Sequence, residues 1–159
     1  MAKEIEKKYL VTSDGYTQNA KKEHLVQGYL CLEPSKAVRV RMGGGKAFLT
    51  IKTLADPEKT LMTRNEFEYE IPMADGEKLL SMCIGSVIKK NRYTVECKGH
   101  VWEVDVFEGA NKGLVVAEIE LSAEDEPFDK PDWVGPDVTE DRRFLNVALA
   151  LNPYTAWKD

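Results

Sequence analysis

Charged and apolar residues alternate one by one through most of the short segments that could form β-strands. The segment NEFEYEI (residues 65–71) is typical, because three glutamates alternate with Phe67, Tyr69 and Ile71. Successive side chains of a strand point to opposite faces, so each segment would have one charged face and one apolar face. A sheet built from them must bury its apolar faces and place its charged faces against water or a charged ligand.

Eight segments with strand character predict a mainly β, antiparallel protein with a few helices. Turn-forming sequences separate them, including GGG at residues 43–45 and KGH at residues 98–100. A closed eight-stranded barrel is expected, because closing a meander of short strands leaves no edge exposed. The expected strands cover residues 4–8, 25–32, 37–41, 47–52, 65–71, 86–97, 101–107 and 114–121.

Two helices are expected to flank these strands. The first covers residues 74–82, and the second is a C-terminal helix at residues 139–151, with Thr139 as its N-cap and acidic residues in its first turn. The proline-rich stretch 126–136 is expected to be a loop. No internal repeat or linker interrupts the chain, so a single domain of residues 1–159 is the simplest organisation.

Net charge and cysteine content argue against several classes of function. The formal charge is −5, whereas general binders of nucleic acid or membrane surfaces carry a net basic surface. The three cysteines form no CxxC motif, which disfavours a disulfide framework or a thiolate zinc site. The N-terminus is charged and no apolar run has membrane-spanning length, so we expect a cytoplasmic protein that binds neither nucleic acid nor membrane.

Two architectures satisfy the alternation, and they differ in which face of the sheet points inward. An ordinary barrel or sandwich buries the apolar faces and leaves the charge in water. The alternative is a tunnel with a charged lumen, whose apolar outside is covered by helices or by another subunit. Segregation of charge by strand favours the tunnel: Arg39 and Arg41 share one strand, and Glu66 and Glu68 share another. Like charges at such short range repel, so clustering them requires a compensating ligand.

A tunnel of this kind has the chemistry of a site for a metal-bound polyphosphate. Arginines and lysines that converge on one place match a polyanion, and guanidinium groups match phosphate oxygens in particular. A carboxylate cluster beside them matches hard divalent cations such as Mg²⁺ or Mn²⁺, which take oxygen ligands. The two groups of residues are therefore predicted to share one ligand.

The ordered set of paired charges resembles the CYTH superfamily, also called the triphosphate tunnel metalloenzymes. The N-terminal EIEKK (residues 4–8) is similar to the ExExK signature of that superfamily, and the resemblance covers essentially the whole chain. The tail from Trp133 onward resembles the short, single-domain bacterial members. The other matching motifs are QGYL (27–30), VRVR (38–41), LTIK (49–52), RNEFE (64–68), KNRY (90–93), EVDVF (103–107) and EIE (118–120).

The resemblance implies an eight-stranded antiparallel tunnel that binds a triphosphate through basic residues and divalent metal through acidic ones. Catalytic roles are expected for Lys8, Glu4, Glu6 and Glu120. The phosphate-binding residues are expected to be Lys8, Arg39, Arg41, Lys52, Lys90 and Arg92. The metal-binding residues are expected to be Glu4, Glu6, Glu66, Glu68, Asp105, Glu118 and Glu120, with Glu103 and Glu70 as further candidates.

Two more features can each be interpreted as functional or as purely structural. Tyr29 matches a tyrosine that lies near the tunnel in relatives, and a buried strand tyrosine would serve equally well. The C-terminal helix resembles a segment that closes one tunnel mouth, and an ordinary packing helix has the same pattern. GGGK at residues 43–46 lacks the spacing of a phosphate-binding loop, so a hairpin turn is expected there.

The function that follows is metal-dependent hydrolysis of inorganic triphosphate to pyrophosphate and phosphate, with Mg²⁺ or Mn²⁺ as the cofactor. Lys8 would either orient the attacking water or bind the terminal phosphate. One alternative is a hydrolase or a cyclase that acts on an organic triphosphate such as ATP or thiamine triphosphate. Another is a module that binds polyphosphate or nucleotide without catalysis. The sequence also leaves open whether two chains pair as a homodimer.

Overall fold

The computed structural model of the chain describes residues 3–33, 36–54 and 60–157. These residues form nine strands, two α-helices and four short 3₁₀ helices. The strands are β1 (Lys3–Val11), β2 (Lys21–Glu33), β3 (Lys36–Gly43), β4 (Lys46–Leu54), β5 (Thr63–Ile71), β6 (Ile84–Cys97), β7 (His100–Phe107), β8 (Val115–Leu121) and β9 (Val134–Asp137). The α-helices are α1 (Met73–Ser81) and α2 (Asn146–Leu151), and the 3₁₀ helices are η1 (Gly15–Thr17), η2 (Gly109–Asn111), η3 (Arg142–Phe144) and η4 (Tyr154–Ala156).

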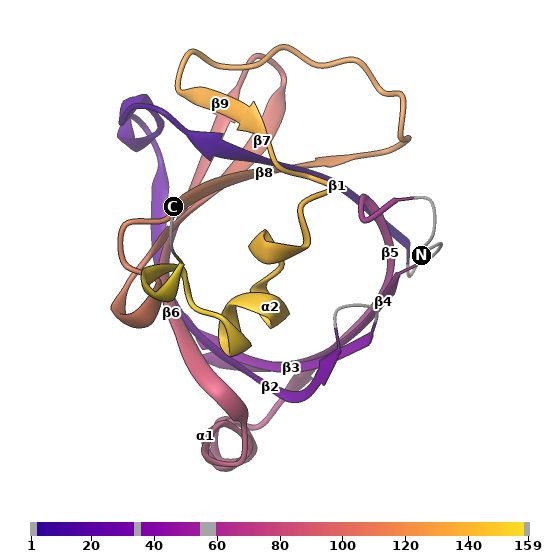
Figure 1. The fold of residues 1–159 in the computed structure, drawn as a ribbon, viewed down its shortest axis with the longest axis vertical. Coiled ribbons are helices and arrows are strands. Elements are labelled where there is room, and N and C mark those ends of the chain that lie inside the picture. The colour runs from indigo at the N-terminus through magenta and orange to yellow at the C-terminus, as the bar shows by residue number, and fades with distance from the viewer. Residues whose placement is uncertain (1–2, 34–35, 55–59, 158–159) are drawn as a thin grey trace.

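Eight of the strands close into an antiparallel barrel, which confirms the predicted architecture (Figure 1). Neighbouring strands follow the order β5-β4-β3-β2-β6-β7-β8-β1, and β1 then pairs with β5 to complete the ring. The closing contact is short, because only residues 3–5 of β1 face residues 63–65 of β5. Farther along the same edge, β1 pairs with β9, which adds a ninth strand outside the ring.

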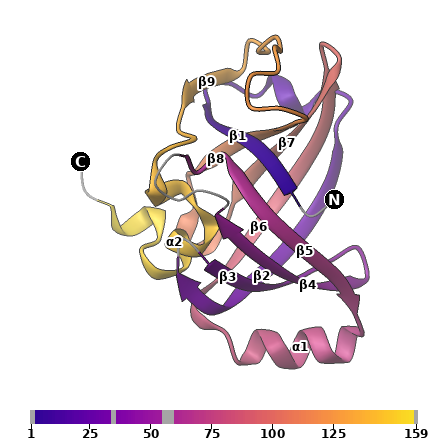
Figure 2. The same ribbon diagram turned by 90° about the vertical axis from the view of Figure 1, so that its right-hand side faces the viewer.

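The connections are not those of a simple meander. β1 lies between β8 and β5, so it is separated from β2, which follows it in the sequence. A second long connection runs from β5 through α1, across the lower end of the barrel in Figure 2, to β6, which pairs with β2. The predicted meander is therefore right for β2–β3–β4–β5 and for β6–β7–β8, and wrong where these two units join β1 and each other.

The predicted loop at residues 126–136 is wrong at its end, where β9 begins at Val134. β9 is a short strand at the edge of the sheet, and an edge position tolerates Pro136, which cannot donate to a neighbouring strand. Its four residues, VGPD, show no alternation of charged and apolar side chains. The pattern that revealed the barrel strands was therefore absent here.

The predicted C-terminal helix begins only at Asn146. Thr139 does not cap it, because the Thr139 hydroxyl accepts a hydrogen bond from the backbone nitrogen of Lys8 (3.0 Å) and so fastens the chain beside β1. Asp141 instead caps η3 by accepting a hydrogen bond from the backbone nitrogen of Arg143. Leu145, with extended backbone angles, then separates η3 from α2.

The inward face of the barrel changes from charged at one end to apolar at the other. Along β6, for example, Arg92 and Lys90 are followed at the next inward position by Ile88, which is fully buried. The apolar end is filled by α2, whose Leu149 is fully buried in one core with Ile88 and Phe107. Figure 1 shows α2 inside the ring of strands. The charged lumen therefore extends along only part of the barrel.

The apolar outer faces of the strands are covered over much of the barrel. Trp102 and Ile119 are fully buried beneath Tyr16 of η1 and Trp133 of the segment before β9. On another side, α1 packs against β2, β3 and β4. The outer face of β4 and β5 stays open in the described chain, where the exposed large apolar side chains include Phe67 and Tyr69. Neither described helix has the length and apolar character that a bilayer crossing needs.

Candidate active site

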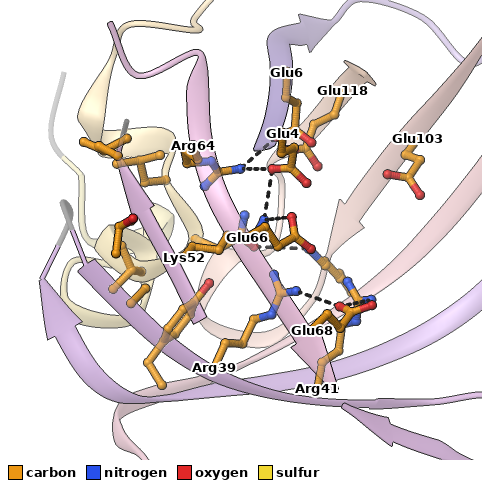
Figure 3. A pocket seen from close by; sticks show the side chains of 18 of the residues that line it. Glu4, Glu6, Arg39, Arg41, Lys52, Arg64, Glu66, Glu68, Glu103 and Glu118 are labelled. Atoms are coloured by element: carbon orange, nitrogen blue, oxygen red, sulfur yellow. Dashed lines mark hydrogen bonds and ion pairs between the residues drawn. The ribbon is translucent and has the colours of Figure 1, made fainter. Parts of the chain in front are cut away.

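A cavity of about 190 Å³ occupies the charged end of the barrel interior, and all eight barrel strands contribute to its wall (Figure 3). Residues 145–147, at the start of α2, close it on the side of the apolar core. The wall holds as many cations as carboxylates, so the charges can neutralise one another. The charged residues that line the cavity are Glu4, Glu6, Arg39, Arg41, Lys52, Arg64, Glu66, Glu68, Lys90, Arg92, Glu103 and Glu118.

Carboxylates from adjacent strands form one part of this wall. Glu4 and Glu6 come from β1 and Glu118 from the neighbouring β8, and they lie close together in Figure 3. Arg64 of β5 donates hydrogen bonds to Glu4 Oε1 (3.0 Å) and to Glu6 Oε1 (3.1 Å). A single guanidinium group therefore holds both glutamates of the N-terminal motif.

Glu6 and Glu118 share a hydrogen bond, and their pKa values move apart. Burial, followed by repulsion from Glu118, raises the pKa of Glu6 well above its usual value. Burial also opposes the charge on Glu118, but Lys8 and the hydrogen bond with Glu6 hold the pKa of Glu118 well below its usual value. Glu6 is therefore the weaker acid of the two and Glu118 the stronger.

Glu4 and Glu66 form a second pair of this kind. Burial and the hydrogen bond with Glu66 raise the pKa of Glu4. For Glu66, the effect of burial is outweighed by that hydrogen bond and by Lys52, so its pKa is lowered. In each of the two pairs, therefore, the pKa of one carboxyl group is raised and that of the other is lowered.

The donor set of these pairs fits a divalent cation. Such an ion takes several oxygen ligands and can replace the proton of a carboxyl group whose pKa is raised. Glu66 Oε2 is buried and accepts no hydrogen bond from the described residues, although Lys52 Nζ lies 3.5 Å away. No three acidic, histidine or cysteine side chains of the described chain already converge on one point. Glu4 and Glu6 contact Arg64 through Oε1 alone, which leaves their Oε2 atoms as candidate ligands for a metal ion.

Cations from β3 and β4 face these carboxylates. Glu68 Oε2 lies 3.7 Å from Arg39 Nη2 and 3.5 Å from Arg41 Nη2. Lys52 Nζ lies 3.3 Å from Glu4 Oε1. Burial and the neighbouring arginines lower the pKa of Arg41 and of Lys52. These cations are short of negative charge, which a polyanionic ligand would supply.

A second set of cations comes from β6. Arg92 binds Asp105 of β7 with two hydrogen bonds, of 2.8 and 3.0 Å. Lys90 Nζ lies 2.8 Å from Asp105 Oδ2. Burial lowers the pKa of Lys90 to about 8, although Asp105 acts in the opposite direction. Lys90 and Arg92 line the cavity, so Asp105 fixes both of them from behind the wall.

Three of the predicted site residues, Lys8, Asp105 and Glu120, do not line the cavity. Lys8 is buried, and its Nζ donates to the backbone oxygen of Phe144 (3.0 Å) and lies 3.7 Å from Glu118 Oε2. Asp105 is held by Lys90 and Arg92, as described above. Glu120 is exposed and lines an adjoining cleft, which shares Glu4, Glu66 and Glu68 with the cavity. The structure brings the other predicted residues together around the cavity.

Among the cavity residues that were not predicted from the sequence, Arg64 and Asn146 contribute charged or amide groups. Arg64 shares the inward face of β5 with Glu66 and Glu68, so the same alternation could have identified it. Asn146 lies in the predicted C-terminal helix, and no pattern in the sequence marks it as polar lining. Of the less certain candidates, Glu103 and Tyr29 line the cavity, whereas Glu70 is exposed and does not.

Fold and site together define a closed β-tunnel whose charged interior suits a metal-bound polyphosphate. The sequence profile of the CYTH domain matches residues 2–149. The chain therefore belongs to the CYTH domain family, as the paired charges indicated.

Proteins and structures similar to this chain agree with that assignment. A protein of Acetivibrio thermocellus named inorganic triphosphatase is 46% identical over 160 residues and is matched along the full length of both chains. A protein of Nitrosomonas europaea with the same name is 36% identical over 155 residues, which cover 94% of this chain and 97% of that protein. The crystal structure of the inorganic triphosphatase NE1496 superposes with a TM-score of 0.67 at 36% identity, and the match covers 95% of this chain and 96% of that one.

Proposed function

We propose that the protein hydrolyses inorganic triphosphate to pyrophosphate and phosphate with the help of a divalent metal ion. The observation that carries the proposal is the cavity, in which cations from β3, β4 and β6 face carboxylates from β1, β5 and β8 across one enclosed space. Such a space matches a polyphosphate on its basic side and a metal ion on its acidic side. Both curated relatives carry the name inorganic triphosphatase, which supports the same substrate.

The substrate would bind by replacing ion pairs between side chains that line the cavity. Arg39 and Arg41 both contact Glu68, and phosphate oxygens can take the place of that carboxylate. Guanidinium groups offer two parallel donors to phosphate, so these arginines would fix the orientation of the chain of phosphates. Lys90 and Arg92 would hold it from β6, which lies beyond β2 from these arginines.

Catalysis would rest mainly on position and charge, because phosphoryl transfer asks little covalent chemistry of the protein. When bound, a divalent ion would neutralise phosphate oxygens and lower the pKa of a bound water. Glu6, whose pKa is raised, would be the stronger base of the two carboxylates once it is ionised, and in that form it would accept the proton that the attacking water loses. Arg39 and Arg41 would offset the charge on the leaving pyrophosphate. Lys8 would act from behind the wall, by fixing Glu118.

The metal ion would be Mg²⁺ or Mn²⁺, because the donors offered by the acidic wall are all carboxylate oxygens. We further propose that residues 1–159 act as one domain in the cytoplasm, without nucleic-acid or membrane partners. The three cysteines are free, which suits a reducing compartment.

A panel of substrates tests the proposal. Purified protein with Mg²⁺ or Mn²⁺ should release phosphate from inorganic triphosphate, and EDTA should abolish the release. ATP, thiamine triphosphate and pyrophosphate are tested as alternative substrates under the same conditions. Faster turnover of ATP or thiamine triphosphate would contradict the proposed substrate. Tight binding of inorganic triphosphate without turnover would instead identify a binding module.

A further inference from the structure

The closed end of the cavity is formed by the first residues of α2. Leu145, Asn146 and Val147 all line the cavity there, and Asn146 is the polar member of the three. Leu145 and Val147 belong to the apolar core beneath. Asn146 is therefore the point at which the C-terminal helix presents a polar group to the charged lumen.

The oxygen of the Asn146 side chain accepts two hydrogen bonds. Lys90 Nζ donates to Asn146 Oδ1 (3.2 Å), and Gln27 Nε2 donates to the same oxygen (3.2 Å). Lys90 and Gln27 are almost completely buried, so these contacts replace water that the two groups cannot reach. Asn146 and Asp105 hold the Lys90 ammonium group from two sides.

These contacts determine which way the Asn146 amide points. An ammonium group can only donate hydrogen bonds, so the amide must turn its oxygen toward Lys90. The NH₂ group then lies on the other side of the amide, and Asn146 as a whole lines the cavity. Within the described ranges, no residue accepts a hydrogen bond from Asn146 Nδ2. Its two protons are therefore available to a ligand.

We propose that Asn146 is a substrate-binding residue of the tunnel, which donates from Nδ2 to a phosphate oxygen at the closed end while its Oδ1 positions Lys90. This inference rests on the proposed function, and it assigns the C-terminal helix a part in recognition besides closing the barrel. A neutral donor beside a buried cation is suited to an anion, because hydrogen bonds to a charged acceptor are stronger than those between neutral groups.

The test compares Asn146→Asp with Asn152→Asp, which places the same new charge at the exposed C-terminal end of α2. Calorimetric titration with inorganic triphosphate in EDTA measures binding without turnover, and steady-state kinetics with Mg²⁺ separate KM from kcat. The carboxylate introduced by Asn146→Asp would keep an acceptor for Lys90 but replace the Nδ2 donor by a group that repels phosphate. We expect Asn146→Asp to weaken binding and raise KM by roughly 100-fold, and Asn146→Ala by roughly tenfold, with kcat changed much less. Asn152→Asp should bind as the wild type does.

Each outcome decides the inference. If folded Asn146→Asp binds triphosphate as tightly as the wild type, Asn146 does not contact the substrate, and the proposed function stands. A lower melting temperature with unchanged KM would show that Asn146 serves only the packing of α2, which also overturns the proposal. If the wild type neither binds triphosphate in EDTA nor hydrolyses it with Mg²⁺, the proposed function fails and this inference fails with it. Asn146→Asp has nearly the shape of the native residue, so it keeps the test available if Asn146→Ala does not fold.

Discussion

The carboxyl group of Glu6 lies against Glu118 and within hydrogen-bond distance of Arg64, in a wall from which water is largely excluded. Ionisation of Glu6 is unfavourable there without a cation, because burial and the charge of Glu118 both oppose it. Ionised Glu6 would therefore be stabilised by a cation bound in the tunnel in addition to the positive charges of the protein. Substitution of Glu6 can separate the energetic cost of ionising this residue from its proposed role in triphosphate hydrolysis.

Glu6→Gln keeps the size of the side chain and removes its ability to become negative. We expect triphosphate hydrolysis to fall by roughly 100-fold or more, because a divalent ion loses a ligand and the ionised form of Glu6 is no longer available as a base. The free energy of unfolding measured in EDTA should stay equal or rise, because an amide in this place imitates the protonated acid. Urea denaturation and phosphate release are the measurements. Glu77→Gln, on the exposed side of α1, is the matched control and should change neither. A large loss of stability in Glu6→Gln would contradict the electrostatic account.

We expect Lys90 to make binding depend on pH, because burial lowers its pKa to about 8, below that of an ordinary lysine. The protonated form attracts phosphate, so a bound polyanion raises this pKa and binding at pH 8 to 9 takes up a proton. We therefore expect the KM for inorganic triphosphate to rise as pH increases above about 8. Calorimetric titrations at pH 8.5 in two buffers of different ionisation enthalpy should reveal the proton uptake. Proton release instead of uptake would show that another group governs this pH range.

Helix α1 shows how a single close contact fixes an element on the barrel. A Cβ atom built at Gly76 would lie 2.6 Å from the Cβ of Ala47 on β4, so the absence of a side chain lets α1 approach the sheet. Replacing an interior helix glycine by alanine normally stabilises a helix by about 1 kcal/mol. Here the steric conflict opposes that gain, because both atoms belong to short and inflexible groups.

We expect Gly76→Ala to lower the free energy of unfolding by about 1 to 3 kcal/mol, as overpacking does in other cores. Urea denaturation measures the change. Glu77→Ala, one residue farther along the exposed side of α1, raises helix propensity slightly without a clash and should be nearly neutral. A stabilised Gly76→Ala variant would mean that α1 moves away from β4 at little cost.

Prediction from the sequence succeeded where an element carries its own periodic pattern. The alternation in β3, β5, β6 and β8 identified both the strands and most of the cavity residues. It failed for β9, which has no alternation, and for residues 139–145, where Thr139 binds β1 and Asp141 caps the short helix η3 instead of a long α-helix. The inward position of Asn146 depends on how α2 packs inside the barrel. The contacts of α2 are with strands far away in the sequence, so they leave no pattern in the sequence around Asn146.

On the scale of the whole molecule, the tunnel is a set of charges from distant parts of the chain, and a ligand that bridges them stabilises the folded state alone. A ligand present at 100 times its Kd adds about 2.7 kcal/mol to the free energy of unfolding. For a chain of this size that corresponds to a rise in Tm of roughly 5–10 °C. We expect such a rise with triphosphate and Mg²⁺ together, measured by differential scanning fluorimetry. NaCl at matched ionic strength is the control, and an equal rise with NaCl would mean that screening of charge, not a bound ligand, is responsible.

The short pairing between β1 and β5, which closes the barrel, has a consequence for folding during synthesis on the ribosome. β1 is the first of the described strands along the chain, and its two partners in the ring follow later, β5 at Thr63–Ile71 and β8 at Val115–Leu121. Its longer pairing, with β8, can therefore form only after most of the other barrel strands have been synthesised. An unpaired strand with apolar side chains is prone to aggregate, and charged side chains on the strand oppose aggregation. We infer that Glu4, Glu6, Lys7 and Lys8 keep the nascent chain from aggregating before the ring closes around them.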